Sequence, residues 1–139
     1  MDRALLDTDV LSELMRGKNA QVVGRAALYL QEHGRFTFSV LTVLEIVKGL
    51  AKAGREARVS PFLQFASGHE VLSLDVESAE IAGRLYAGLE SQGRPIGRID
   101  PMIAAVALKY RLILVTGNTS HYQRVQDLGF DLKLADWRQ

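Results

Sequence analysis

Short apolar runs alternate along the chain with longer segments in which apolar residues recur every three or four positions. The short runs, bounded by polar or turn residues, predict five strands, at residues 4–6, 36–39, 71–74, 112–116 and 131–134. The longer segments predict helices at residues 10–15, 20–31, 41–52, 76–91, 101–110 and 121–128, with one more beginning near Pro61. Strands separated by helices are joined by right-handed crossovers into a mostly parallel sheet. The pattern therefore predicts an α/β fold in which helices flank a sheet of about five strands.

The length and composition are those of one globular domain. The chain has 139 residues, of which 47% are hydrophobic and 24% charged, so we expect a single domain over residues 1–139. It has no cysteine, which excludes disulfides, thiolate metal sites and cysteine nucleophiles. The longest apolar run, residues 102–108, is far shorter than the roughly 18 residues of a membrane span, and the first residues lack the apolar core of a signal peptide. We therefore expect a cytoplasmic protein with no membrane partner.

The charge balance becomes informative only if the chain forms an acidic pocket. The 17 Lys and Arg residues nearly match the 16 Asp and Glu residues, and the net charge is +1. Such a balance does not by itself indicate a nucleic-acid partner. If three or four carboxylates were gathered in one pocket, however, the rest of the surface would be mildly basic.

Acidic and amide residues follow the predicted strands or open the predicted helices. They are Asp7, Glu45, Asp100 and Asn118. In an open parallel sheet the carboxyl ends of the strands meet at one edge, where ligands bind. Clustered carboxylates repel one another unless a cation lies among them. Oxygen donors, with no cysteine and only three scattered histidines, favour Mg²⁺ or Mn²⁺ over zinc.

Several of these residues also have a structural explanation. Asp100 precedes a proline, which is typical of a helix N-cap, and Thr42-x-x-Glu45 matches a capping box. Asp9 could cap the first helix. Asp7 is harder to explain by capping, because Thr8 and Asp9 are the better caps for that helix.

Five groups of residues, taken together, suggest a family. In chain order they are Leu5-Leu6-Asp7-Thr8-Asp9-Val10-Leu11, Ser39-x-x-Thr42-x-x-Glu45, Gly93-Arg94-Pro95-Ile96-Gly97-x-x-Asp100-x-x-Ile103-Ala104-Ala105, Val115-Thr116-x-Asn118-x-x-His121-Tyr122 and Asp136-Trp137. Over residues 4–137 this arrangement resembles the PIN-domain ribonucleases, specifically the VapC-type toxins of toxin–antitoxin pairs. The resemblance implies a three-layer α/β sandwich and a Mg²⁺-dependent endoribonuclease, with Mn²⁺ as a substitute ion. It also implies an RNA substrate such as tRNA, a VapB-type antitoxin that inhibits the toxin, and a homodimer.

The resemblance also assigns roles by position. Asp7 and Asp100 correspond to metal ligands, and Glu45 and Asn118 to further catalytic residues. The supporting polar residues are Asp9, Ser39, Thr42 and Thr116. Two positions depart from the family pattern, since aspartate is more usual at Asn118 and asparagine at Asp9. Asn118 contributes no charge, which favours one well-bound ion over two.

Arg94 and Arg98 are candidate RNA contacts. They lie in a loop with glycine and proline just before Asp100. A polyanion reaches a carboxylate pocket through cationic surroundings, so arginines in this place are suited to bind phosphate. A solvated loop without a binding role is the alternative.

Three other functions compete with the ribonuclease. A haloacid-dehalogenase-like phosphatase would use Asp7 and Asp9, but it expects Thr or Val where this chain has Leu11. A receiver-like Mg²⁺ module, which is not an enzyme, would use the same two residues with Asp75, but it expects a lysine after the last strand. Asp75 is more simply the N-cap of the helix that follows it. A toxin that acts mainly by binding is the third alternative.

Overall fold

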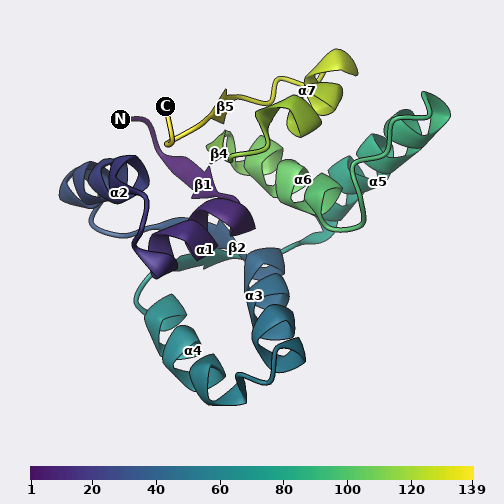
Figure 1. The fold of residues 1–139 in the computed structure, drawn as a ribbon. Coiled ribbons are helices and arrows are strands. Elements are labelled where there is room, and N and C mark those ends of the chain that lie inside the picture. The colour runs from purple at the N-terminus through teal and green to yellow at the C-terminus, as the bar shows by residue number, and fades with distance from the viewer.

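The computed structural model describes residues 1–139, which form an α/β fold (Figure 1). The strands are β1 (Ala4–Leu6), β2 (Thr37–Ser39), β3 (Glu70–Leu72), β4 (Ile113–Val115) and β5 (Leu134–Ala135). The helices are α1 (Thr8–Arg16), α2 (Ala20–His33), α3 (Val40–Lys52), α4 (Val59–Ser67), α5 (Val76–Ser91), α6 (Asp100–Tyr110) and α7 (Thr119–Asp127). A short 3₁₀ helix, η1 (Glu56–Arg58), precedes α4.

All strand pairs are parallel. β4 lies between β1 and β5 in one hydrogen-bonded sheet, and β2 pairs with β3 in a second. β1 also contacts β2, so β1 has β2 on one side and β4 on the other. The chain therefore leaves β1 in one direction along the sheet and returns to its other side, and the carboxyl ends of β1 and β4 flank the point of reversal. Ligands of open α/β folds bind at such a point.

Side chains of β1 alternate between two hydrophobic cores. Leu5 packs into a core formed with α5, α6 and α7, which includes Leu85 and Ile103. Ala4 and Leu6 face the opposite core, which α1, α2 and α4 cover. Because successive strand residues point to opposite faces, a three-residue strand is enough to join both cores. The predicted three-layer sandwich with helices on both faces is thus confirmed (Figure 1).

The predicted elements are all present, with shifted ends. The last strand differs most from its prediction. A strand was predicted at residues 131–134, whereas only Leu134–Ala135 pair with β4. Its register is set by β4, where Leu114 lies opposite Leu134 and Val115 opposite Ala135. The periodicity near Pro61 indicated only part of its helix, because η1 leads into α4 from Val59. None of the seven α-helices combines the length and the apolar character that a membrane span requires.

Trp137 fixes the C-terminal segment to the core. It is 3% exposed, and its ring lies 5.7 Å from that of Tyr29 on α2. The Tyr29 hydroxyl accepts a hydrogen bond from the backbone N–H of Ala4, at 3.1 Å. One aromatic contact therefore joins the C-terminal segment, α2 and the first strand.

Replacing Trp137 with Ala should lower the free energy of unfolding by about 3–5 kcal/mol, because it removes a large buried side chain and leaves a cavity. Urea unfolding followed by circular dichroism would measure the loss. Tryptophan fluorescence cannot be used for the variant, because Trp137 is the only tryptophan. Leu28→Ala is the control, because Leu28 is 55% exposed and should change the free energy by less than about 0.5 kcal/mol. A loss below about 1 kcal/mol for Trp137→Ala would contradict the anchoring role.

Candidate active site

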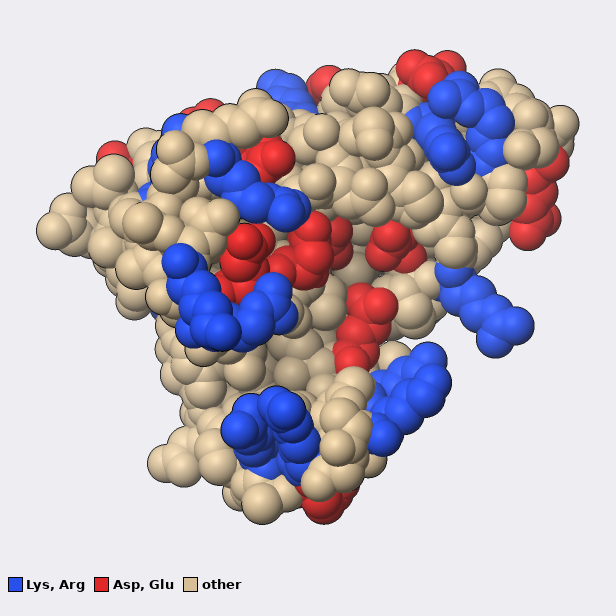
Figure 2. Space-filling view, in the orientation of Figure 1, with Lys and Arg blue, Asp and Glu red and all other residues tan.

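The polar residues singled out in the sequence gather where the ends of β1 and β4 meet the first turns of α3 and α6. Asp7 follows β1, Thr116 follows β4, Glu45 lies on α3 and Asp100 is the first residue of α6. Figure 2 shows Asp and Glu side chains in a hollow on this face, with Lys and Arg side chains around it. The fold therefore brings residues from four separate segments to one place.

Asp7 is a buried carboxylate, with 5% of its surface exposed. One of its oxygens accepts a hydrogen bond from the backbone N–H of Thr8 at 2.9 Å, and the other accepts one from the Thr116 hydroxyl at 2.8 Å. Burial, and then the carboxylates of Asp9 and Asp100, raise the pKa of Asp7 to about 7. The expectation that Asp7 has no capping role is wrong, because it is the N-cap of α1. Its ionised form is nevertheless costly unless a cation lies beside it.

Asp100 faces the same hollow from the start of α6. Its carboxylate lies 3.3 Å from Nε2 of His121, a nitrogen that also contacts a backbone carbonyl oxygen of the preceding loop. Burial raises the pKa of Asp100 and the carboxylates of Glu45 and Asp9 add to the shift, whereas His121 opposes it. The capping interpretation of Asp100 is wrong, because Ile99 holds the N-cap position and Asp100 makes no capping hydrogen bond. The Asp100 carboxylate is therefore available to the hollow.

Glu45 is tied to the N-terminal segment through Thr8. The Thr8 hydroxyl donates to Oε1 of Glu45 at 2.6 Å and lies 2.9 Å from the Thr42 hydroxyl. The predicted capping box of Thr42 and Glu45 is wrong, because Ser39 is the N-cap of α3 and its hydroxyl accepts from the backbone N–H of Thr42. Ser39 and Thr42 are fully buried. They fix the start of α3, and Glu45 with it.

The turn after β4 holds Thr116 and Asn118. The Thr116 hydroxyl donates to Asp7 and accepts from the backbone N–H of Asn118, at 3.0 Å. The Asn118 side chain makes no capping hydrogen bond and is exposed.

The capping interpretation of Asp9 is wrong, because Asp9 lies inside the first turn of α1 and its Oδ2 accepts from the backbone N–H of Gly117, at 3.0 Å.

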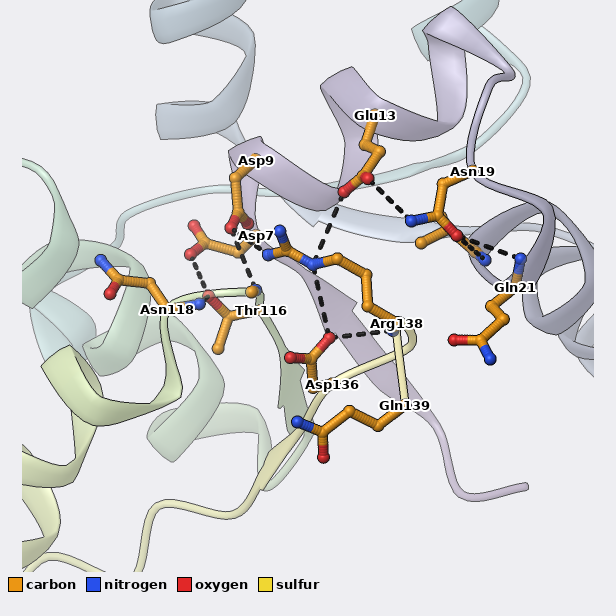
Figure 3. Close-up of polar contacts among 12 residues, drawn as sticks. Asp7, Asp9, Glu13, Asn19, Gln21, Thr116, Asn118, Asp136, Arg138 and Gln139 are labelled. Carbon is orange, nitrogen blue, oxygen red and sulfur yellow. Dashed lines mark hydrogen bonds and ion pairs between the residues drawn. The ribbon is translucent and has the colours of Figure 1, made fainter.

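Arg138 belongs to the site although nothing in the sequence indicated it. Its guanidinium lies 3.4 Å from Asp9, 3.7 Å from Glu13 and 3.5 Å from Asp136 (Figure 3). Burial raises the pKa of Asp9, and the positive charge of Arg138 opposes that shift. Arg138 and Asp9 are 129 positions apart, so no local spacing reveals their contact.

His121 and Tyr122 were also missed as site residues. Tyr122 is fully buried, and its hydroxyl lies near the carboxylates of Asp7 and Asp100. Burial, together with the carboxylates of Asp7 and Asp100, raises the pKa of Tyr122 well above its usual value, so the hydroxyl stays protonated. Both residues lie in the first turn of α7, directly after β4. Their place at the same sheet edge as Asp7 is the signal that could have found them.

A divalent cation fits the donor chemistry of Asp7 and Asp100. Their carboxylate oxygens are hard donors, and they lie close enough for their negative charges to repel each other, so a cation between them would be favourable. No three His, Asp or Glu side chains lie close enough to ligate one ion among them. Two carboxylates, completed by water or phosphate oxygens, match the way in which proteins hold Mg²⁺.

Arg94 and Arg98 lie on the loop between α5 and α6, outside the group of carboxylates. Arg94 pairs with Asp127 near the end of α7, at 2.9 Å. The side chain of Arg98 is exposed, and its backbone carbonyl accepts a hydrogen bond from Tyr86. The structure brings neither arginine into contact with Asp100. A role in binding RNA would therefore concern phosphates beyond the carboxylates.

A groove of about 740 Å³ opens beside Glu45, between α1, α3 and α4. Its floor includes the aromatic ring of Phe62, and three arginines, Arg16, Arg55 and Arg58, line it. The groove was not predicted, because it forms only where α1 packs beside α3 and α4, which follow it in the sequence after α2 and β2. It gives the hollow an apolar and basic extension.

Comparison with known proteins agrees with this geometry. The profile of the PIN domain matches residues 4–128. The chain is 33% identical over 138 residues to a protein of Shigella flexneri named tRNA(fMet)-specific endonuclease VapC, with 99% of each chain covered. It is 28% identical over 134 residues to Ribonuclease VapC1 of Haemophilus influenzae, with 96% of each chain covered.

Two solved structures with the same fold contain VapBC proteins. The structure of DNA-bound VapBC from Salmonella typhimurium matches with a TM-score of 0.80 and 28% identity, over 99% of each chain. The structure of VapBC-1 from nontypeable Haemophilus influenzae matches with a TM-score of 0.82 and 27% identity, over 98% of each chain. The match to the PIN profile spans most of the chain, and the relatives span nearly all of it. The chain therefore belongs to the PIN domain family and, within it, to the VapC ribonucleases.

Proposed function

We propose that this chain is a metal-dependent endoribonuclease toxin that hydrolyses phosphodiester bonds in structured RNA. The observation that carries the proposal is the buried carboxylate of Asp7 beside Asp100, at the edge of a PIN-type sheet where the strand order reverses. PIN-domain VapC nucleases generally depend on divalent metal ions. We propose Mg²⁺ for this chain, with Mn²⁺ as a substitute, held by Asp7 and Asp100.

Bound there, the ion would lower the pKa of water and neutralise charge on the phosphoryl oxygens. The chain's own residues then orient the reactants. Glu45, held at Oε1 by the Thr8 hydroxyl, can accept a proton from the attacking water on its other oxygen. Asn118 has a carboxamide free to donate to the phosphate. Ser39, Thr42 and Thr116 keep these groups in place, and His121 orients Asp100.

The proposed substrate and partners follow from the relatives. One relative is named as tRNA(fMet)-specific, and we extend to this chain an RNA substrate, with tRNA the first to test. The related solved structures contain VapB-type antitoxins, and we propose such an inhibitor here. The groove beside Glu45, with its apolar floor and arginines, suits a segment of that partner. A homodimer and a cytoplasmic location remain predictions from the sequence.

Two observations leave the receiver-like and phosphatase alternatives without support, and the cleavage experiment below tests a toxin that acts mainly by binding. Asp75, which a receiver-like module needs near Asp7, is the N-cap of α5 and pairs with Lys109. The phosphatase alternative has no counterpart among the similar proteins described above, which are VapC nucleases.

Asp100→Asn should reduce RNA cleavage at least about 100-fold, since even residues that only support metal ligands cost 10- to 100-fold when changed. To measure cleavage, total RNA is incubated with each purified protein in Mg²⁺ or Mn²⁺, and the ends of the fragments are mapped. EDTA should abolish cleavage by the parent protein. Asp75→Asn is the matched control, because Asn caps a helix as well as Asp does. Cleavage by folded Asp100→Asn at the parent rate would contradict the assignment.

Replacing Arg94 and Arg98 together with Ala should reduce the salt dependence of RNA binding. If both bind phosphate, the slope of log affinity against log salt should shrink by about 1.4 to 2, because each contact releases a counterion. Binding is measured by fluorescence anisotropy in EDTA, which prevents cleavage. The control is the double variant Arg25→Ala with Arg84→Ala, which removes the same amount of charge from α2 and α5 and should leave the slope unchanged. An unchanged slope in the Arg94 and Arg98 variant would remove both residues from the interface.

Asp7→Asn should change how stability depends on pH. Because the pKa of Asp7 is about 7 in the folded protein and near 3.8 in the unfolded chain, the unfolded chain releases its proton first as pH rises, and the free energy of unfolding falls between about pH 4 and pH 7. The carboxamide of the variant cannot titrate. The stability of the variant relative to the parent should therefore rise by about 4 kcal/mol from pH 4 to pH 8 in EDTA.

Urea unfolding at each pH measures this difference. Millimolar Mg²⁺ should shrink it at pH 8, because the ion stabilises only the parent protein. A difference that stays constant with pH in EDTA would show that Asp7 is not the buried group whose ionisation opposes folding.

A further inference from the structure

One guanidinium balances a second group of carboxylates at the rim of the site. Asp9, Glu13 and Asp136 each lie within 4 Å of Arg138, and no other Lys or Arg pairs with them. The side chains of Glu13 and Asp136 are 19% and 16% exposed, so they are only partly screened by water. The group of three carboxylates and one arginine has a net charge of −2. Arg138 is thus the sole local counterion in a strongly negative region (Figure 3).

The position of Arg138 is fixed from several directions. The preceding residue, Trp137, is buried in the core, and the backbone N–H of Arg138 donates to Asp136 at 2.9 Å. The guanidinium lies directly against Gly117, where any added side chain would overlap it. Gly117 is therefore required for the close approach of the arginine to the turn after β4.

The Arg138 contact also determines what Asp9 can bind. Oδ2 of Asp9 accepts hydrogen bonds from both the Gly117 backbone and the Arg138 guanidinium. Asp9 is near enough to Asp7 and Asp100 for its charge to affect both. A carboxylate so close to two proposed metal ligands would itself bind a cation if no fixed positive charge occupied that side.

We propose that Arg138 is a positioning residue whose guanidinium takes the place of a second cation beside Asp9, so that the site holds one divalent ion. The proposal rests on the proposed function, in which Asp7 and Asp100 hold that ion. Arg138 keeps Asp9 bonded to the turn after β4 and out of the set of metal ligands. Without Arg138, no fixed positive charge would remain beside Asp9, and a divalent ion ligated by the Asp9 carboxylate, with water completing its shell, could take that place.

The test counts bound Mn²⁺ in the RNA-free protein, by isothermal titration calorimetry and by electron paramagnetic resonance of free Mn²⁺. The parent protein should bind one ion per chain and Arg138→Gln two. Arg138→Lys, which keeps the positive charge, should bind one. Asp9→Asn combined with Arg138→Gln should return the number to one, because the carboxylate that gains the second ion is then absent. Arg138→Met is a second variant without the charge, in case Arg138→Gln does not fold.

The controls separate local from general charge effects. Arg84→Gln removes the same charge from an exposed pair on α5 and should leave one ion. One ion in both folded Arg138→Gln and Arg138→Met would overturn the role of Arg138 while leaving the proposed function intact, and so would two ions in Arg138→Lys or Arg84→Gln. No Mn²⁺ bound by the parent protein would overturn the proposed metal site and this inference together.

Discussion

The structure depends on a carboxylate placed where water hardly reaches it. Asp7 ends a strand whose residues are all buried, and it is itself 5% exposed. Taking an ionised carboxylate out of water is unfavourable unless hydrogen bonds and opposite charge replace the solvent. Two donors are present, the Thr8 backbone and the Thr116 hydroxyl, but the nearest charges are the negative ones of Asp9 and Asp100. A cation beside Asp7 would offset both its burial and this repulsion, and the proposed chemistry of the site follows from that.

The surroundings of Asp7 have two kinds of charge balance. On one side Asp100 contacts His121, and no Lys or Arg pairs with it, so mobile positive charge can enter there. On the other side Asp9 has a fixed partner in Arg138. The fold thereby separates a place for an exchangeable ion from a place whose charge is built into the chain. A phosphodiester that approaches the hollow meets the place for the exchangeable ion, beside Asp100, and basic side chains surround the hollow (Figure 2).

The sequence predicted the fold and which polar residues gather at the sheet edge, because both follow from the pattern of strands and helices. The periods of apolar residues indicate every strand and helix, and a parallel sheet brings the ends of its strands to one edge, so Asp7, Glu45, Asp100 and Asn118 could be grouped in advance. Capping was predicted less well, since Asp7, Ser39 and Ile99 hold N-cap positions assigned elsewhere or not at all. Cap identity depends on one or two backbone torsions, which composition does not determine.

Contacts between distant segments could not be predicted. Arg138 lies beside Asp9 because the core holds the neighbouring Trp137, and its guanidinium fills the space where Gly117 lacks a side chain. Both contacts are properties of the tertiary structure. In the sequence, Tyr122 resembles any apolar helix residue, and only the structure shows its buried hydroxyl near two carboxylates. The groove beside Glu45 likewise exists only once α1, α3 and α4 are assembled.

Crystals grown with Mn²⁺ would locate the bound ion through its anomalous scattering. We predict an anomalous peak ligated by the carboxylates of Asp7 and Asp100, at a Mn²⁺ concentration that supports RNA cleavage. A peak bound elsewhere, with Asp7 and Asp100 free of metal, would contradict it. So would the absence of any peak under those conditions.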